Sequence, residues 1–354
     1  MKDYFVIGLM SGTSLDGLDI AYCNFTFNKT WTYEISAFQT FYYSDSFKER
    51  LRNAPNVNSN ILNKLADDFG LFMAEKTNLF IKHHRISKID LISSHGHTVF
   101  HQPEKGITLQ IGNPIPIYDL LKTPIAYDFR IQDVLLGGQG APLVPFVDAL
   151  LFSEYDACLN LGGFSNISFD CKGERIAFDI CPVNIVLNIW AEKLGIPFDN
   201  KGLLAQSGTV DMELLTELNK LNFYNNPLPK SLAWEWVQEF ILPLLNKRKR
   251  SEIVILRTFT EHVAIQLVAV FSQYKLKHIL VSGGGVFNEF LLTRVNVLSN
   301  SVLLKTDPKI IESKEAMAFA FLGLMKMKNK INILASVTGS VKDHCSGKIY
   351  TEEL

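Results

Sequence analysis

The sequence predicts an α/β protein built from two related lobes with a cleft between them, and three observations support this fold class. Short apolar segments alternate with longer stretches of helical periodicity, as in α/β domains. Residues 5–22 read as a strand, a polar turn and a second strand, and residues 157–170 repeat that pattern in the second half of the chain. The length of 354 residues exceeds one ordinary hydrophobic core and favours two domains.

The first polar turn carries groups that can bind phosphates. Glycines at both ends allow the backbone N–H groups to approach a ligand, two hydroxyls add donors, and Asp16 is a candidate ligand of Mg²⁺, directly or through water. No Gly-Lys-Ser/Thr follows, so the turn is not a P-loop. The alternative is an ordinary hairpin whose polar turn faces water. The candidate nucleotide-binding residues are Gly12, Thr13, Ser14, Leu15, Asp16, Gly17, Leu18 and Asp19.

The rest of the first half continues the α/β pattern. A third strand is expected over residues 31–43, followed by helices over residues 46–53 and 59–83. Short strands that end in polar residues are expected at 89–93, 107–112 and 124–130. The glycine-rich stretch 132–145 is typical of a hinge between domains. We therefore expect one lobe of residues 1–131 plus about 310–354, and a second of residues 132–309.

The second half offers two further glycine loops. Gly162 and Gly163 lie in the repeated hairpin, and Gly283, Gly284 and Gly285 follow an apolar strand at 279–282 and precede a helix at 288–297. Such a loop admits a phosphate or a flat ligand, or simply makes a tight turn. Two hairpins and a triple glycine in a duplicated chain together predict a nucleotide held between two lobes. This is the plan of the superfamily of sugar kinases, heat-shock ATPases and actin, whose lobes are ribonuclease H-like.

Composition limits the range of partners. An apolar fraction of 47% with 20% charged residues is typical of a globular protein, and a net charge of −1 gives no reason to expect nucleic acid or an anionic membrane as partner. Five scattered cysteines without C-x-x-C spacing favour reduced thiols in the cytoplasm. The sequence carries no cleavage-site pattern and no uninterrupted apolar run of about 18 residues, so we expect neither export nor a membrane span. A homodimer is compatible with these features.

Several motifs together resemble the anhydro-N-acetylmuramic acid kinase family. They span nearly the whole chain in the family's order, and the Gly-Gly-Gln-Gly-Ala-Pro-Leu-Val-Pro run is the most specific. The resemblance implies an enzyme that splits the 1,6-anhydro bond of a cell-wall amino sugar with water and phosphorylates the freed 6-oxygen from ATP with Mg²⁺, in peptidoglycan recycling. The motifs are residues 8–19, 94–96, 128–130, 137–145, 161–163 with Asn166, 283–285 with Asn288, and 315–320.

This reaction needs a general base that activates water. The resemblance assigns that role to Asp179, which follows the expected strand 175–178. The family reads Asp-Thr-Gly-Pro-Gly-Asn here, whereas this chain has Ile180, Cys181 and Val183 at three of those positions. The alternative is that Asp179 only caps a helix over residues 184–194.

Other replacements leave the exact sugar open. Trp234 stands where the family has an arginine, and Asp148 stands where histidine is common. Two alternatives follow: a kinase of a different small sugar, or a weakly active nucleotide-binding regulator of the same fold.

Five residues are expected to contact the sugar, and most have an alternative role. His95, with His97 and His101, could instead form a metal cluster or make structural hydrogen bonds. Arg130 and Asp133 could pair across the lobes. Glu315 could merely favour the start of a helix over residues 316–325. The candidate substrate residues are His95, Arg130, Asp133, Asn184 and Glu315.

Overall fold

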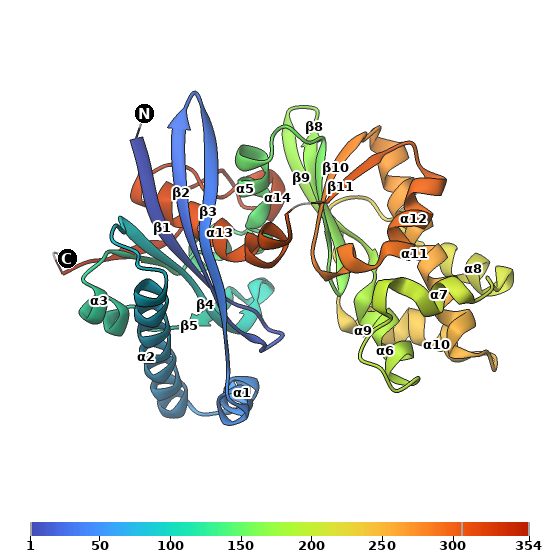
Figure 1. Cartoon of the computed structure of the whole chain (residues 1–354), viewed down its shortest axis with the longest axis horizontal. Helices are drawn as coiled ribbons and strands as arrows, with labels where there is room; N and C mark the ends of the chain where they lie inside the picture. Colours follow the sequence, from blue (N-terminus) through green and yellow to red (C-terminus); the bar gives the residue numbers. More distant parts are fainter. Residues whose placement is uncertain (1, 306, 353–354) are drawn as a thin grey trace. The chain divides into compact units, whose positions relative to one another are not determined.

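The computed structural model describes residues 2–305 and 307–352, and the chain divides into two compact units (Figure 1). Unit 1 comprises Met1–Leu151 and Glu312–Leu354, and unit 2 comprises Phe152–Ile311. Each unit contains a mixed β-sheet with helices packed on it. The predicted α/β class is confirmed.

Unit 1 is built on a sheet in the order β12-β6-β4-β1-β2-β3, with β5 paired to β4. Its strands are β1 (Lys2–Ser11), β2 (Gly17–Asn28), β3 (Thr30–Tyr42), β4 (Leu91–Gln102), β5 (Ile107–Ile111), β6 (Ile125–Tyr127) and β12 (Lys348–Tyr350). Its helices are α1 (Asp45–Arg52), η1 (Ala54–Asn56), α2 (Ser59–His83), η2 (Pro103–Lys105), α3 (Ile115–Leu121), α4 (Ile131–Leu135), α5 (Val144–Leu151), α14 (Ala335–Thr338) and most of α13 (Pro308–Met327).

Unit 2 has a five-stranded sheet in the order β11-β10-β7-β8-β9. Its strands are β7 (Ala157–Leu161), β8 (Phe164–Cys171), β9 (Glu174–Pro182), β10 (His278–Ser282) and β11 (Val302–Lys305). Its helices are α6 (Asn184–Glu192), η3 (Asn200–Gly202), α7 (Leu203–Ser207), α8 (Met212–Asn219), η4 (Asn222–Asn225), α9 (Trp234–Trp236), η5 (Val237–Ile241), α10 (Leu242–Asn246), α11 (Glu252–Tyr274), η6 (Gly284–Phe287) and α12 (Glu289–Leu298).

Five strands of the unit 1 sheet follow the same order as the five strands of the unit 2 sheet, which confirms the predicted relation between the lobes. In unit 1, β1, β2 and β3 form an antiparallel meander, and β4 and β6 then add in parallel beside β1. In unit 2, β7, β8 and β9 form the same meander, and β10 and β11 add in parallel beside β7. Each hairpin turn therefore lies at the sheet edge toward which the next parallel strand runs.

Alternation along β1 places helices on both faces of the unit 1 sheet. Ile7 and Leu9 belong to the core cluster that α2 joins through Phe69. Gly8 points to the other face, where an added Cβ would lie 1.9 Å from the Ala316 carbonyl oxygen of α13. Only glycine lets α13 approach this strand so closely.

Helix α11 is long and apolar enough to cross a membrane by length and composition, the one such helix among the described residues. It is a core helix of unit 2: 67% of its apolar window is buried, and Phe259, Val263 and Leu267 belong to the central cluster. Its composition therefore reflects packing inside unit 2.

The predicted hinge at 132–145 is wrong, and the unit boundary differs from the expected one. Residues 132–151 belong to unit 1, so the chain divides after residue 151 and after residue 311. The glycines wrap around the buried carboxylate of Asp133, which accepts hydrogen bonds from the Gly140 N–H (2.7 Å) and the Thr338 hydroxyl (2.7 Å). A Cβ on Gly138 would lie 2.2 Å from that carboxylate.

Two other expected boundaries are also corrected. The strand expected to end before Ser94 continues as β4 to Gln102, because β5 pairs with its second half. Glu315 lies within α13 rather than at the start of a helix.

A buried ion pair fixes α13 to the rest of unit 1. Lys314 Nζ lies 2.8 Å from Asp148 Oδ1, and the two side chains are 10% and 6% exposed. Removing one partner of such a pair leaves a buried charge uncompensated, which costs about 3–5 kcal/mol.

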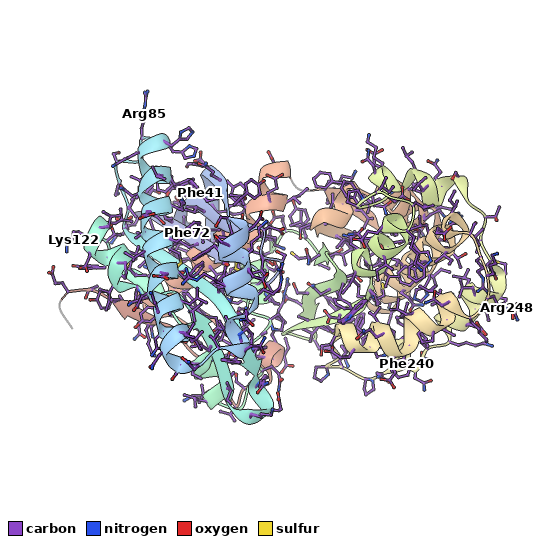
Figure 2. The ribbon with its side chains drawn as sticks, turned by 90° about the horizontal axis from the view of Figure 1, so that it is seen from below. Phe41, Phe72, Arg85, Lys122, Phe240 and Arg248 are labelled. Atoms are coloured by element: carbon purple, nitrogen blue, oxygen red, sulfur yellow. The ribbon has the colours of Figure 1, made fainter. Side chains whose placement is uncertain are left out.

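Lys314→Met should therefore lower the free energy of unfolding of unit 1 by about 3–5 kcal/mol in denaturant titrations followed by circular dichroism. Lys122→Met is the matched control, because Lys122 pairs with Asp119 on the outer surface (Figure 2) and should cost less than about 1 kcal/mol. Equal effects of the two substitutions would contradict this role of the buried pair.

Candidate functional site

The turn between β1 and β2 presents polar groups to solvent. Thr13, Ser14 and Asp16 are exposed. The left-handed residue of the turn is Leu15, with φ at 62°, rather than a glycine, and its N–H donates to the Gly12 carbonyl at 3.3 Å. A bulky residue in this region is strained, and such strain concentrates at functional sites.

A buried network supports the turn from below. The Tyr43 hydroxyl donates to Ser11 Oγ at 2.7 Å, and Ser11 Oγ lies 2.9 Å from His97 Nδ1. Burial lowers the pKa of His97 to about 4, so the imidazole is neutral near pH 7. His97 therefore braces the hairpin, and its hydrogen bond fits the structural alternative to a metal cluster.

Two carboxylates beside the turn could hold a magnesium ion brought in with phosphates. Thr40 donates to Asp19 Oδ1 at 2.5 Å. Burial raises the pKa of Asp19, and the neighbouring charges of Asp16 and Glu312 raise it further, so a cation here would be favourable. Within the described ranges no group of three or more His, Cys, Asp or Glu could hold a metal. Magnesium bound mainly through phosphate needs only one or two carboxylates, so Asp16 and Asp19 fit that role.

Arg130, which follows β6, and His95, which lies within β4, form one buried network. Arg130 Nε donates to His95 Nε2 at 2.9 Å, and Nη1 donates to the Gly140 carbonyl at 2.6 Å. His95 is 5% exposed, and burial together with the Arg130 charge lowers its pKa well below 6.5. Burial lowers the pKa of Arg130 to about 10. The imidazole is neutral and orients the guanidinium, which remains charged.

The two remaining candidate acids of unit 1, Asp133 and Glu315, differ in their access to solvent. Asp133 is 0% exposed and its oxygens are occupied, so the expected direct contact with sugar is wrong and its role is to shape the 137–140 loop. Part of Glu315 is exposed to solvent, although neighbouring groups crowd its carboxylate. Its surroundings raise its pKa by desolvation first and by Asp19 second, while Arg130 and Lys314 act in the opposite direction.

In unit 2 the two predicted glycine loops and Asn184 lie together. The Gly163 carbonyl accepts from the Val183 N–H at 2.7 Å, and the Gly162 carbonyl accepts from the Asn184 N–H at 3.2 Å. A Cβ on Gly284 would have the Asn184 amide nitrogen, at 4.0 Å, as its nearest neighbour. The ends of β7 and β10 thus meet the start of α6.

Packing explains some of these glycines and leaves others unexplained. A Cβ on Gly285 would lie 2.7 Å from Leu161 Cβ, and one on Gly17 would lie 2.6 Å from the Phe41 carbonyl oxygen. Gly283 has φ at 83° and a similarly close neighbour. By contrast, a Cβ would meet no atom closer than 3.4 Å at Gly12, Gly162, Gly163 or Gly284. The open space there suits the close approach of a ligand to the backbone.

Asp179 lies within β9, at a β-bulge, rather than after a strand. Ser165 pairs with Cys181 and Asn166 with Asp179, so Ile180 is the extra residue. The Leu232 N–H donates to Asp179 Oδ2 at 2.8 Å, and the Asp179 N–H donates to the Lys230 carbonyl at 3.2 Å. Burial raises the pKa of Asp179, and the Leu232 N–H partly offsets this. Bulges commonly re-aim side chains beside active sites.

Two sequence expectations about this region change. Helix α6 has Val183 at its N-cap without a side-chain hydrogen bond, so the alternative that Asp179 caps this helix is wrong. The replacements Ile180, Cys181 and Val183 are at most 2% exposed and belong to the unit 2 core. They alter packing behind Asp179 rather than a surface that a ligand touches. Lys230 and Leu232 could not be recognised from the sequence. Both bind Asp179 through backbone groups, and a backbone contact does not depend on residue type.

Two sequence comparisons with known proteins agree over nearly the whole chain. The protein-family model described as anhydro-N-acetylmuramic acid kinase matches residues 4–352 of this chain. Proteins of that name from Hydrogenovibrio crunogenus and Pasteurella multocida are 32% and 33% identical, over 97% and 99% of this chain and 97% of each relative. A solved ROK family glucokinase from Streptomyces griseus, in complex with glucose and AMPPNP, is 10% identical with a TM-score of 0.40, covering 90% of this chain and 98% of that chain.

Gly12→Val should raise the dissociation constant for ATP at least about tenfold in calorimetry, because the side chain would fill the open space beside the turn. The melting temperature should change by less than about 2 °C, since the nearest neighbour of the Cβ is the flexible Ser14 side chain. Gly285→Ala is the contrast and should lower the melting temperature. Unchanged affinity in Gly12→Val would remove this turn from the nucleotide site.

Proposed function

The chain belongs to the anhydro-N-acetylmuramic acid kinase family, and we propose that the described residues divide its reaction between the two units. The protein is an ATP-dependent kinase of an anhydro amino sugar in peptidoglycan recycling. Unit 1 contributes the β1–β2 turn to the phosphates, with Asp16 and Asp19 toward magnesium. Unit 2 contributes the glycine loops to the nucleotide and Asp179 as the general base.

The half-buried carboxylate of Asp179 is the observation that carries this assignment. Leu232 holds Oδ2, while Oδ1 makes no hydrogen bond to any described residue. One oxygen is thus fixed and the other is available to a water molecule. A raised pKa also makes this carboxylate a stronger base than an exposed aspartate, which suits proton abstraction from water.

The proposed sequence of bond changes starts at Asp179. Its Oδ1 takes a proton as the water oxygen bonds to the anomeric carbon, and the bond from that carbon to the 6-oxygen breaks. The 6-oxygen then bonds to the γ-phosphorus of ATP as the bond to the ADP oxygen breaks. Magnesium, when bound, neutralises charge on the phosphates. Backbone N–H groups of the turn and the charges of Arg130 and Glu315 would orient the reactants.

The buried positions of Ile180, Cys181 and Val183 support anhydro-N-acetylmuramic acid over a different small sugar. Trp234 is 37% exposed and remains the replacement most able to alter sugar preference. A cytoplasmic location, where ATP is available, is supported by the five free thiols, and a homodimer stays a prediction for sedimentation velocity.

Asp179→Asn should lower kcat by about 10²–10⁴-fold with little change in ATP affinity, because Asn keeps size and loses basicity. Steady-state turnover of anhydro-N-acetylmuramic acid and ATP calorimetry measure the two quantities. Asp170→Asn is the control, since Asp170 lies on the neighbouring strand β8 and pairs with Arg175. Near-normal turnover in Asp179→Asn would move the base elsewhere, with Glu315 the next candidate.

The pH dependence should report the same group. The base acts only as a carboxylate, and its pKa is raised, so kcat/KM should fall as the pH drops through a value above the ordinary 3.8 of aspartate. This fall at low pH is the acid limb of the profile. The residual activity of Asp179→Asn should show no such acid limb. An acid limb that persists unchanged in the variant would assign it to another group.

A further inference from the structure

We propose that Lys230 is a positioning residue whose ammonium group holds the backbone segment that orients the Asp179 carboxylate. This inference rests on the proposed role of Asp179 as the base. Two observations carry it: the hydrogen bonds of Lys230 and the lack of packing around its segment.

Lys230 makes contacts in two directions. Its Nζ donates to the carbonyls of Phe223 at 3.3 Å and Tyr224 at 3.2 Å, both in η4. Its own carbonyl accepts the Asp179 N–H at 3.2 Å, and two residues later the Leu232 N–H donates to Asp179 Oδ2 at 2.8 Å. One side chain therefore ties the segment that binds the carboxylate to η4.

Element η4 is itself anchored in the core of unit 2. The Tyr224 hydroxyl lies 2.7 Å from His262 Nε2 in α11, and His262 Nδ1 lies 2.6 Å from Asn219 Oδ1. Gln266 also donates to Asn219 Oδ1, so that oxygen is the acceptor and Nδ1 carries the proton. His262 Nε2 then accepts from Tyr224, and burial lowers the pKa of His262 to about 3. The His262 side chain that anchors η4 is therefore neutral, and its hydrogen bonds fix its position.

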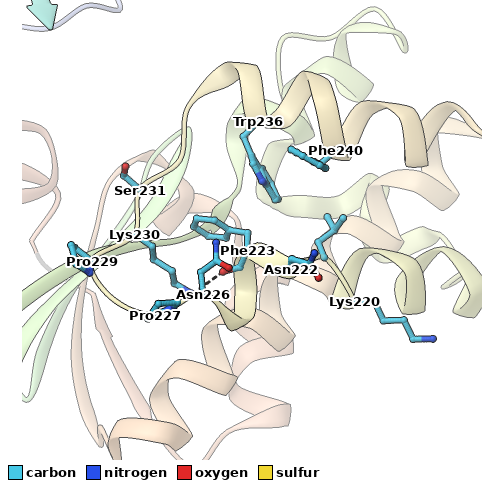
Figure 3. Close-up of a pocket in the computed structure, with 11 residues that line it drawn as sticks. Lys220, Asn222, Phe223, Asn226, Pro227, Pro229, Lys230, Ser231, Trp236 and Phe240 are labelled. Atoms are coloured by element: carbon cyan, nitrogen blue, oxygen red, sulfur yellow. Dashed lines mark hydrogen bonds between the residues drawn. The ribbon is translucent and has the colours of Figure 1, made fainter. Parts of the chain in front are cut away.

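Close packing does not surround the segment that contains Lys230. A groove of about 800 Å³ lies beside it, lined by Phe223, Trp236 and Phe240 among others (Figure 3). Pro227, Leu228 and Pro229 are exposed, whereas Lys230 is half-buried. Desolvation lowers the pKa of Lys230, so holding a cation here has a cost. The bonds of the ammonium group offset that cost by fixing residues 230–232.

The test is Lys230→Met in the full chain, with kcat, KM for ATP and the pH profile of kcat/KM as readouts. We expect kcat to fall up to about 100-fold with KM for ATP unchanged. The acid limb should move to higher pH, because a loosened Leu232 N–H no longer lowers the pKa of Asp179. Arg250→Met is the control, since it removes a buried cation that pairs with Asp211 in the same unit.

Chemical rescue separates positioning from misfolding. Lys230→Cys should be impaired, and alkylation with 2-bromoethylamine, which restores an ammonium at nearly the same length, should recover most of kcat. The parent enzyme treated in the same way controls for its native thiols. Normal kcat in Lys230→Met, a loss equal to that of Arg250→Met without a shift of the acid limb, or no rescue would each overturn the proposal. An active Asp179→Asn would instead overturn the function on which it rests.

Discussion

The strand order shared by the two sheets is the constraint on which the candidate site depends. In each unit a parallel strand follows the meander, so the hairpin turn lies at the sheet edge toward which that next strand runs. In unit 1 this brings the β1–β2 turn beside His97, because Ser11 pairs with His97. In unit 2 it brings the Gly162–Gly163 turn beside the triple glycine, because β7 and β10 are parallel neighbours. The strand order therefore brings residues that are far apart in the sequence together at one edge of each sheet.

Much of this arrangement can be predicted from the sequence, because local signals agree with it. The glycine-rich turns, the strand periodicity and the helix at Ser59–His83 all follow from nearby residues. The helix begins after a typical N-cap residue, with Asn58 accepting from the Ile61 N–H at 3.0 Å. Such features need no knowledge of distant contacts.

The errors arise where distant residues decide the outcome. Gly137, Gly138 and Gly140 look like a hinge in sequence, yet they wrap a carboxylate that also binds Thr338, far along the chain. Asp179 looks like a strand end or a helix cap, yet it lies at a bulge and binds Leu232, 53 positions away. Backbone donors and acceptors leave no trace in residue type, so neither Leu232 nor the carbonyl of Lys230 could be recognised in advance.

Asp179 is central to the account because one of its oxygens is fixed and the other makes no hydrogen bond to the described residues. The most direct measurement is a single turnover in ¹⁸O-labelled water with anhydro-N-acetylmuramic acid and ATP, analysed by mass spectrometry. The account predicts that the parent enzyme forms the sugar 6-phosphate with one label at the anomeric oxygen and none in the phosphate. Asp179→Asn, saturated with ATP, should form no labelled sugar while the parent completes its turnover. Labelled sugar formed by Asp179→Asn at the parent rate would contradict the account.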